Sequence, residues 1–256
     1  MPLQFRESGV TVYTINYKQL MNNLCQIKLF KDHAIQKIYF EQWEIVLKQA
    51  EKEDLKDYYP YYRLHGLNDQ YFAYQFFLGE QECFLHFNVS KLMSSPILTS
   101  ISSENIPVKK FSDPYSDIFW KKPADGKHSQ TPEKPIIIIP LYIGTYHHMV
   151  IDGNHRIQEA LEKSADTILC QYIDILPLLA SETFLTRFDH LFYGFLCELT
   201  LMTLEENSDD VSLLKESYLH YRYHVFDNIQ PTSQTPSLPR KWFRKILSSF
   251  PWNKEQ

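Results

Sequence analysis

The chain of 256 residues is long enough for one or two domains, each with its own hydrophobic core. With 44% hydrophobic and 22% charged residues the composition is that of a globular protein, and a formal net charge of −5 gives no general attraction to nucleic acid or anionic membranes. The first ten residues lack the pattern of a signal peptide, and the longest apolar run, near Ile136 to Ile143, is too short to span a bilayer. We therefore expect a cytoplasmic protein that is not an integral membrane protein.

The N-terminal third changes from a helical to a strand pattern. Apolar residues recur at helical spacing from about Tyr17 to Glu53, with a break near Phe30 to Asp32, which predicts a helical hairpin. Aromatic and β-branched runs at Tyr71 to Leu78 and Cys83 to Val89 then flank a short Gly-containing turn, which predicts a β-hairpin.

The segment from Ser94 to Lys134 is rich in proline and has few periodic apolar positions, which favours a long loop or irregular turns. Loops of this kind are often functional, and this one carries the carboxylates Glu104, Asp113 and Asp117.

From Pro135 to Asp174 the pattern predicts a β-β-α-β unit. Two apolar runs, Ile136 to Ile143 and Tyr146 to Ile151, flank a Gly-Thr turn and predict a second hairpin. A helical pattern then begins near Asn154, and Thr167 to Ile175 reads as another strand.

The C-terminal part is predicted to be helical and acidic. One long amphipathic helix is expected from Phe184 to Met202 and another from Val211 to Phe226, where His220 and His224 lie one turn apart and form a candidate metal pair without a further ligand nearby. Residues 178–239 hold nine Asp or Glu and three Lys or Arg, a poor composition for a DNA-reading module. Residues 227–239 resemble a linker, and the basic amphipathic tail at 240–250 could dock a partner or cover the core.

Chemistry and pattern coincide at Asp152-Gly153-Asn154-His155-Arg156, called the pentad below, which occupies the predicted strand-to-helix turn. A helix start offers free N–H groups to an anion, Gly153 allows close backbone approach, and Arg156 adds a permanently charged fork for phosphate. Asp152 could orient a hydroxyl or a magnesium ion. The alternative is an ordinary capped turn, because Asp, Asn and Gly are also common at helix starts that bind nothing.

The order of hairpin, G-x-x-R turn, helix and strand resembles the ParB/sulfiredoxin superfamily, here as Val150 to Arg156 followed by Ile157 to Lys163. The resemblance covers about 40 residues, or residues 84–177 if Phe84 to Val89 supplies the family's earlier strand. It implies a nucleotide-binding fold in which Gly153 and Arg156 contact phosphate, with Asn154 and His155 beside them.

Within that superfamily the pentad is most similar to one branch. Sulfiredoxins carry their catalytic cysteine where this chain has Asn154, so the attacking thiolate is absent. ParB proteins have Gly-Glu-Arg-Arg at the turn and a second Glu-Asn box downstream, which neither Glu104-Asn105 nor Glu206-Asn207 reproduces. The free-serine kinases have an Asp-Gly-x-His-Arg turn, which the pentad matches residue by residue.

We therefore expect an α+β protein with a ParB/sulfiredoxin-like β-β-α-β unit, an N-terminal helical hairpin and β-hairpin, and a C-terminal helical region. The expected divisions are an N-terminal α/β extension at 1–83, the ParB/sulfiredoxin-like domain at 84–177, the helical region at 178–226, and the linker and tail at 227–256.

The resemblance implies a phosphotransferase or phosphohydrolase that uses ATP or another NTP with Mg²⁺ on a small hydroxyl compound. Arg156 and the helix-start amides would hold phosphates, His155 would stabilise developing charge, and Asp152 would orient the acceptor or metal. The general base would come from the carboxylates of the proline-rich segment. A metal site built from His155 and either His147 or His148, which should point to opposite strand faces, is a further hypothesis.

Two other functions stay open. The first is a non-catalytic nucleotide or anion switch that engages a protein partner. The second is a ParB-like DNA-associated module, against which the acidic downstream region counts.

Overall fold

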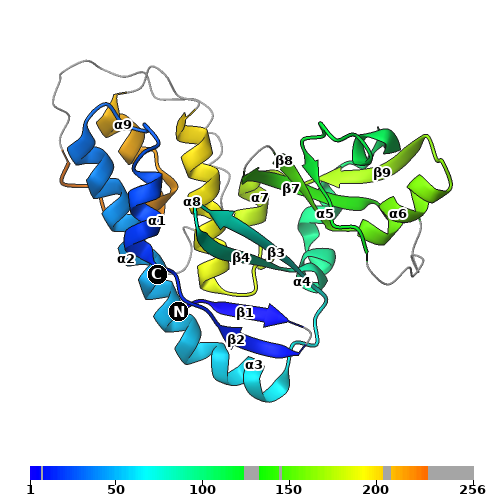
Figure 1. The fold of residues 1–256 in the computed structure, drawn as a ribbon, viewed down its shortest axis with the longest axis horizontal. Helices are drawn as coiled ribbons and strands as arrows, with labels where there is room; N and C mark the ends of the chain where they lie inside the picture. The colour runs from blue at the N-terminus through cyan, green and yellow to red at the C-terminus, as the bar shows by residue number, and fades with distance from the viewer. Residues whose placement is uncertain (7, 124–132, 144–145, 204–208, 230–256) are drawn as a thin grey trace.

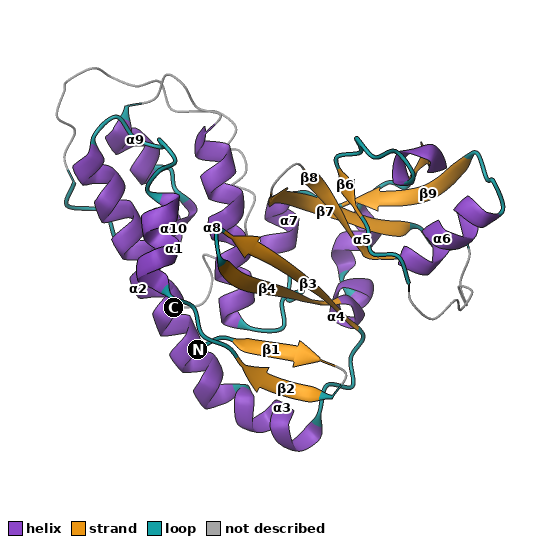
Figure 2. Cartoon of the chain, in the orientation of Figure 1, coloured by secondary structure: helices purple, strands orange, loops and turns teal. Residues whose placement is uncertain are grey.

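The computed structural model describes residues 1–6, 8–123, 133–143, 146–203 and 209–229. Within these ranges the protein is α+β, with ten α-helices, two antiparallel two-stranded sheets and one five-stranded mixed sheet. Helices and the two small sheets form one part of the molecule, and the five-stranded sheet with its crossover helix forms the other (Figures 1 and 2).

The N-terminal part begins with the hairpin of β1 (Leu3–Arg6) and β2 (Gly9–Val12), followed by helices α1 (Tyr17–Leu24) and α2 (His33–Asp57). Asn16 caps α1 by accepting from the Gln19 amide at 3.2 Å, and Asp32 caps α2 by accepting from the Ala34 amide at 2.7 Å. The two predicted helices are confirmed, but the break between them is longer than predicted, because α1 already ends at Leu24 and α2 begins only after Asp32.

Helix α3 (Tyr59–His65) continues along β2, and the predicted hairpin follows as β3 (Tyr71–Leu78) and β4 (Gln81–Asn88). The β3–β4 pair forms a sheet of its own that packs on the helices. The segment Phe84 to Val89, proposed above as an extra strand of the central unit, therefore lies in a different sheet from the pentad.

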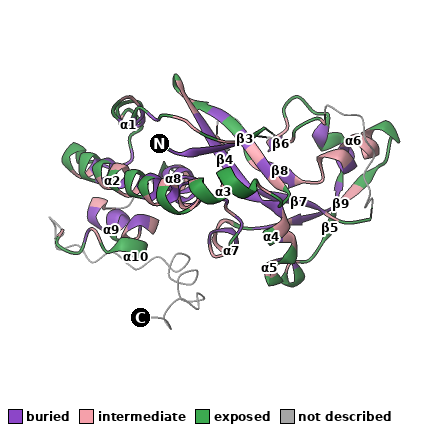
Figure 3. Cartoon of the chain, turned by 90° about the horizontal axis from the view of Figure 1, so that it is seen from below, coloured by how far each residue is buried: buried purple, intermediate pink, exposed green. Residues whose placement is uncertain are grey.

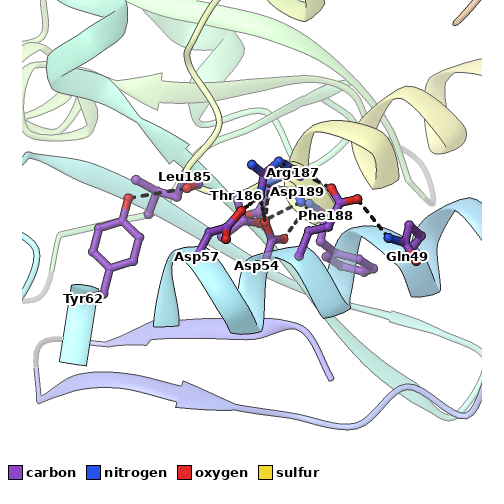
Figure 4. A network of polar contacts seen from close by, with 10 residues as sticks. Gln49, Asp54, Asp57, Tyr62, Leu185, Thr186, Arg187, Phe188 and Asp189 are labelled. Atoms are coloured by element: carbon purple, nitrogen blue, oxygen red, sulfur yellow. Dashed lines mark hydrogen bonds and ion pairs between the residues drawn. The ribbon is translucent and has the colours of Figure 1, made fainter. Parts of the chain in front are cut away.

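The long C-terminal helix α8 (Arg187–Thr203) packs along α2 and against β4 and β7 (Ile136–Ile143). It starts three residues later than predicted, because Phe184 forms a β-bridge to Phe87 instead. The buried carboxylate of Asp54 accepts from the amides of Arg187 at 3.1 Å and Phe188 at 2.9 Å, which ties the start of α8 to α2 (Figure 4).

The prediction of one helix from Val211 to Phe226 is wrong. The structure has two short helices, α9 (Asp210–Lys215) and α10 (Tyr218–Tyr223). Ser217 separates them, because its hydroxyl accepts from the His220 amide at 3.0 Å and so caps a new helix start. The predicted linker beyond residue 229 and the basic tail lie outside the described residues.

The central unit has the predicted order of β7, β8 (Tyr146–Asp152), α6 (Asn154–Glu162) and β9 (Thr167–Tyr172). Strand β7 is antiparallel to β8 and parallel to β9, and the full strand order is β5-β9-β7-β8-β6. The β-β-α-β prediction is confirmed.

The two edge strands were not predicted. They are β5 (Glu104–Pro107), antiparallel to β9, and β6 (Ile118–Phe119), parallel to β8. Both come from the proline-rich segment, which also holds α5 (Pro96–Ser100) and a 3₁₀ turn at Val108–Phe111, after α4 (Val89–Ser94). Strands of two and four residues are too short to leave a periodic pattern in the sequence.

Strand β7 is buried on both faces, which explains its uninterrupted apolar run. Ile137 and Ile139 join the large core formed with α2, α8, β3 and β4, whereas Ile136 and Ile138 join a smaller core under α6. Helix α7 (Ile175–Leu179) also belongs to the large core, where it packs against β7 and α8. Figure 3 shows buried residues gathered in the strands, while the outer faces of α2 and α3 are exposed.

None of the helices in the described ranges is long and apolar enough to cross a membrane. All four cysteines are free thiols, three of them buried, and burial raises the pKa of Cys83 to about 12 and that of Cys170 to about 11.

Candidate functional site

The pentad lies where predicted, with Asp152 as the last residue of β8 and Asn154 as the first of α6. Gly153 joins the two elements in a left-handed conformation, with φ 102° and ψ 14°. A Cβ atom on Gly153 would lie 2.4 Å from Cγ2 and 2.8 Å from Cβ of Ile136. Both the backbone angles and the contact with the β7 strand therefore require glycine at this position.

Asp152 and Arg156 form a close ion pair across the turn. Arg156 Nη2 lies 2.6 Å from Asp152 Oδ2, and the side chains are only 5% and 16% exposed. The other carboxylate oxygen, Oδ1, accepts a long hydrogen bond of 3.4 Å from Nε2 of Gln70, which precedes β3. Asp152 thus fixes the guanidinium at the start of α6 and leaves one of its own oxygens only weakly engaged.

Asn154 and His155 complete the first turn of α6 and are both partly exposed. The Asn154 side chain does not cap its own helix; its Oδ1 accepts from the backbone amide of Lys121 at 2.9 Å. This bond holds the chain just after β6 beside the helix start. The first amides of any helix have no acceptor within the helix, so those of α6 are directed toward this same region.

The structure does not bring the three predicted carboxylates to the pentad. Glu104 pairs with Cys170 in edge strand β5, on the side of the sheet away from β8. Asp113 accepts from the Tyr115 amide at 2.9 Å within an exposed turn. Asp117 lies beside His148, four residues before Asp152 and so about 13 Å along the strand.

His147 and His148 both contact that same carboxylate. Nδ1 of His148 lies 3.3 Å and Nδ1 of His147 lies 3.8 Å from Asp117 Oδ2. His148 also packs edge-on against Tyr172, on the face of the sheet that α6 covers. These contacts place the two histidines at the far end of β8 from the pentad, and the hypothesis of a metal shared with His155 stays a prediction.

Sequence reasoning missed Gln70 and Lys121 as neighbours of the pentad. Gln70 reaches Asp152 from 82 positions away, and Lys121 contributes only a backbone amide. A surface glutamine and a main-chain group carry no signal in the sequence that would distinguish them from their neighbours.

The arrangement is suited to hold an anion. The guanidinium is a planar, permanently charged fork of N–H donors, and its Nη2 donates to Asp152 Oδ2. The pair itself is neutral, so the local positive charge for a bound anion would come from the helix-start amides and the positive end of the helix dipole, with the guanidinium close beside them.

Comparisons with known proteins give no relative: no family model, no curated protein and no solved structure matches this chain.

Proposed function

We propose that the pentad binds the phosphate groups of a nucleotide, and that the protein is a nucleotide-dependent phosphotransferase or phosphohydrolase of the cytoplasm. The observation that carries this proposal is the buried Asp152–Arg156 pair at the start of α6, behind a glycine that allows close approach. The similarity of the pentad to the Asp-Gly-x-His-Arg turn of free-serine kinases supports the same function.

The roles follow from the contacts of each side chain. Arg156 and the amides of the first helical turn hold phosphate oxygens, and His155 stabilises charge on the transferred group. Asp152 has committed Oδ2 to Arg156, so its other oxygen, Oδ1, is the atom that would orient Mg²⁺ or the hydroxyl of a small acceptor. ATP or another NTP supplies the phosphoryl group.

A non-catalytic switch is the second candidate, and one observation favours it. Glu104, Asp113 and Asp117, the expected sources of a general base, lie away from the pentad or are engaged in other contacts. In this alternative a nucleotide binds without turnover and changes the affinity of the protein for a partner protein. The tail at 240–250 is the hypothetical docking segment for that partner, and it lies outside the described residues. DNA association is disfavoured by the acidic composition of residues 178–239.

The test is to incubate the protein with Mg²⁺ and ATP, CTP or GTP while following thermal stability and nucleotide turnover. Arg156→Lys and Asp152→Asn keep the size of the side chains but remove the planar fork and the carboxylate charge, respectively. The matched control is Arg63→Lys, at an exposed arginine of α3.

Turnover that both pentad variants lose and the control retains supports the enzyme. Stabilisation without turnover, lost in Arg156→Lys, supports the switch. If no nucleotide changes the stability of the wild-type protein or is consumed, the pentad is an ordinary strand-to-helix turn and both functions are wrong.

A further inference from the structure

The end of α10 brings together three side chains of the types that bind metal ions. His220 and His224 lie one turn apart, and Asp227 follows in the next turn of the chain. One ligand atom from each lies within 4.8 Å of the other two, and Nε2 of His220 is 3.6 Å from Asp227 Oδ1. Across the ranges that the structure describes, this is the only such group of three. The turn thus supplies the third ligand that the histidine pair lacked in the sequence.

The backbone that carries these three side chains is anchored by neighbouring residues that are buried in the core. Leu219 directly precedes His220 and Phe226 directly precedes Asp227, and both are completely buried in the large core. The His224 amide donates to the His220 carbonyl at 2.7 Å, and the Phe226 ring stacks on the His220 ring. His220 is therefore fixed, with its side chain 14% exposed, while the side chains of His224 and Asp227 extend into solvent.

We infer that His220, His224 and Asp227 form a binding site for one divalent transition-metal ion such as Zn²⁺. Two imidazoles and one carboxylate are a ligand set that zinc accepts, and three protein ligands leave a fourth position for water or another ligand. Metal–ligand bonds of about 2.0–2.2 Å place neighbouring ligand atoms roughly 3.5 Å apart, so rotation of the two exposed side chains closes the remaining distance.

Metal binding at His220 requires a change in one hydrogen bond that this ring makes with the backbone. The Phe226 amide donates to Nδ1 of His220 at 3.3 Å, so the neutral ring carries its proton on Nε2, which faces Asp227. A metal on Nε2 moves that proton to Nδ1, where it opposes the Phe226 N–H. Metal binding therefore breaks this bond and releases the Phe226 amide.

The experiment uses the full chain after treatment with a chelator, titrated with Zn²⁺ alone at pH 7.5 and followed by calorimetry. His224→Asn suits the left-handed backbone of that residue, at φ 51°, and Asp227→Asn keeps the side-chain size. His33→Ala, an exposed histidine at the start of α2, is the matched control. Circular dichroism checks that each variant folds.

We expect one tight equivalent of Zn²⁺ in the wild type and in the control. Each ligand variant should weaken this site by at least about 100-fold, since loss of an outer partner alone costs about 10–100-fold. The Phe226 amide should lose protection from hydrogen exchange when zinc is added. Equal zinc binding by folded wild-type and His224→Asn proteins, or an unchanged Phe226 amide in the zinc-loaded protein, would overturn the inference.

Discussion

Gly153 is the residue on which the geometry of the pentad depends most. Its positive φ turns the chain from β8 into α6 within one residue, and its missing side chain leaves room for Ile136 and for the Arg156 guanidinium, whose Nη2 would be 2.9 Å from a Cβ atom. The strand, the helix and the arginine are thus brought together at one backbone position.

We expect Gly153→Ala to lower the free energy of unfolding by more than about 2 kcal/mol, from the left-handed backbone of about 1–2 kcal/mol and the overlap with Ile136. Gly9→Ala is the control, because Gly9 also has a positive φ, at 124°, but nothing lies within 4 Å of its Cβ position. Urea unfolding measures both. Equal losses in the two variants would show that the contact with Ile136 has no energetic importance.

The Asp152–Arg156 pair should show strong energetic coupling, because each buried charge compensates the other. Asp152→Ala and Arg156→Ala are each expected to cost about 3 kcal/mol, and the double variant should cost less than the sum by about 1–3 kcal/mol. A double-mutant cycle from urea unfolding gives the coupling. Additive losses would mean that the two side chains contribute independently.

At the scale of helices and strands, the elements that could be predicted from the sequence are those with a long periodic pattern of apolar residues. The β7–β8–α6–β9 order followed from the change of period at Asn154, and α2 followed from the helical spacing of apolar residues after the break near Phe30 to Asp32. The short edge strands β5 and β6 could not be predicted, because their pairing depends on neighbours distant in the chain. The split between α9 and α10 had a local signal, Ser217, which the apolar spacing around it outweighed.

The same limits apply to the site. The residues of the pentad and their place in the turn were predicted from the sequence, since turn chemistry and helix starts are local properties. The pairing of Asp152 with Arg156 and the distance of Asp117 from the turn depend on side-chain directions, which the pattern does not contain.

Helix α8 carries a buried carboxylate that should make stability depend on pH. Burial raises the pKa of Glu198 from 4.5 to about 8, although its Oε1 accepts from the Tyr218 amide at 3.1 Å. The folded protein therefore keeps a proton that the unfolded chain releases. This contribution to stability is fully present below pH 4.5 and is lost as the pH rises through about 8.

We expect Glu198→Gln to become progressively more stable relative to the wild type between pH 5 and 9, as measured by urea unfolding at each pH. Glu182→Gln, at a side chain 84% exposed, is the control and should show no comparable trend. A constant difference between Glu198→Gln and wild type across this range would contradict the prediction.

At the scale of the whole molecule, one hydrophobic core connects the helices with the five-stranded sheet. Ile137 and Met149 of the sheet belong to the same core as Trp43 of α2 and Phe195 of α8. The Tyr193 hydroxyl of α8 also donates to the Pro140 carbonyl of β7 at 2.8 Å, at the point where the β7–β8 register shifts.

We therefore expect the two parts to unfold together. In full-length variants that keep a single tryptophan, Trp43 reports on the large core and Trp120 on the small core under α6. Their urea transitions should have the same midpoint, because the two cores share strand β7. Separate midpoints would show that the sheet and the helices are independent folding units.

We propose that the start of α6 binds phosphate, and backbone amide NMR tests this binding most directly. Addition of ATP or pyrophosphate should shift the amide signals of Asn154, His155 and Arg156 more than any signals on α2, and Arg156→Lys should reduce these shifts. Amide signals in the first turn of α6 that do not move at saturating nucleotide would contradict the account.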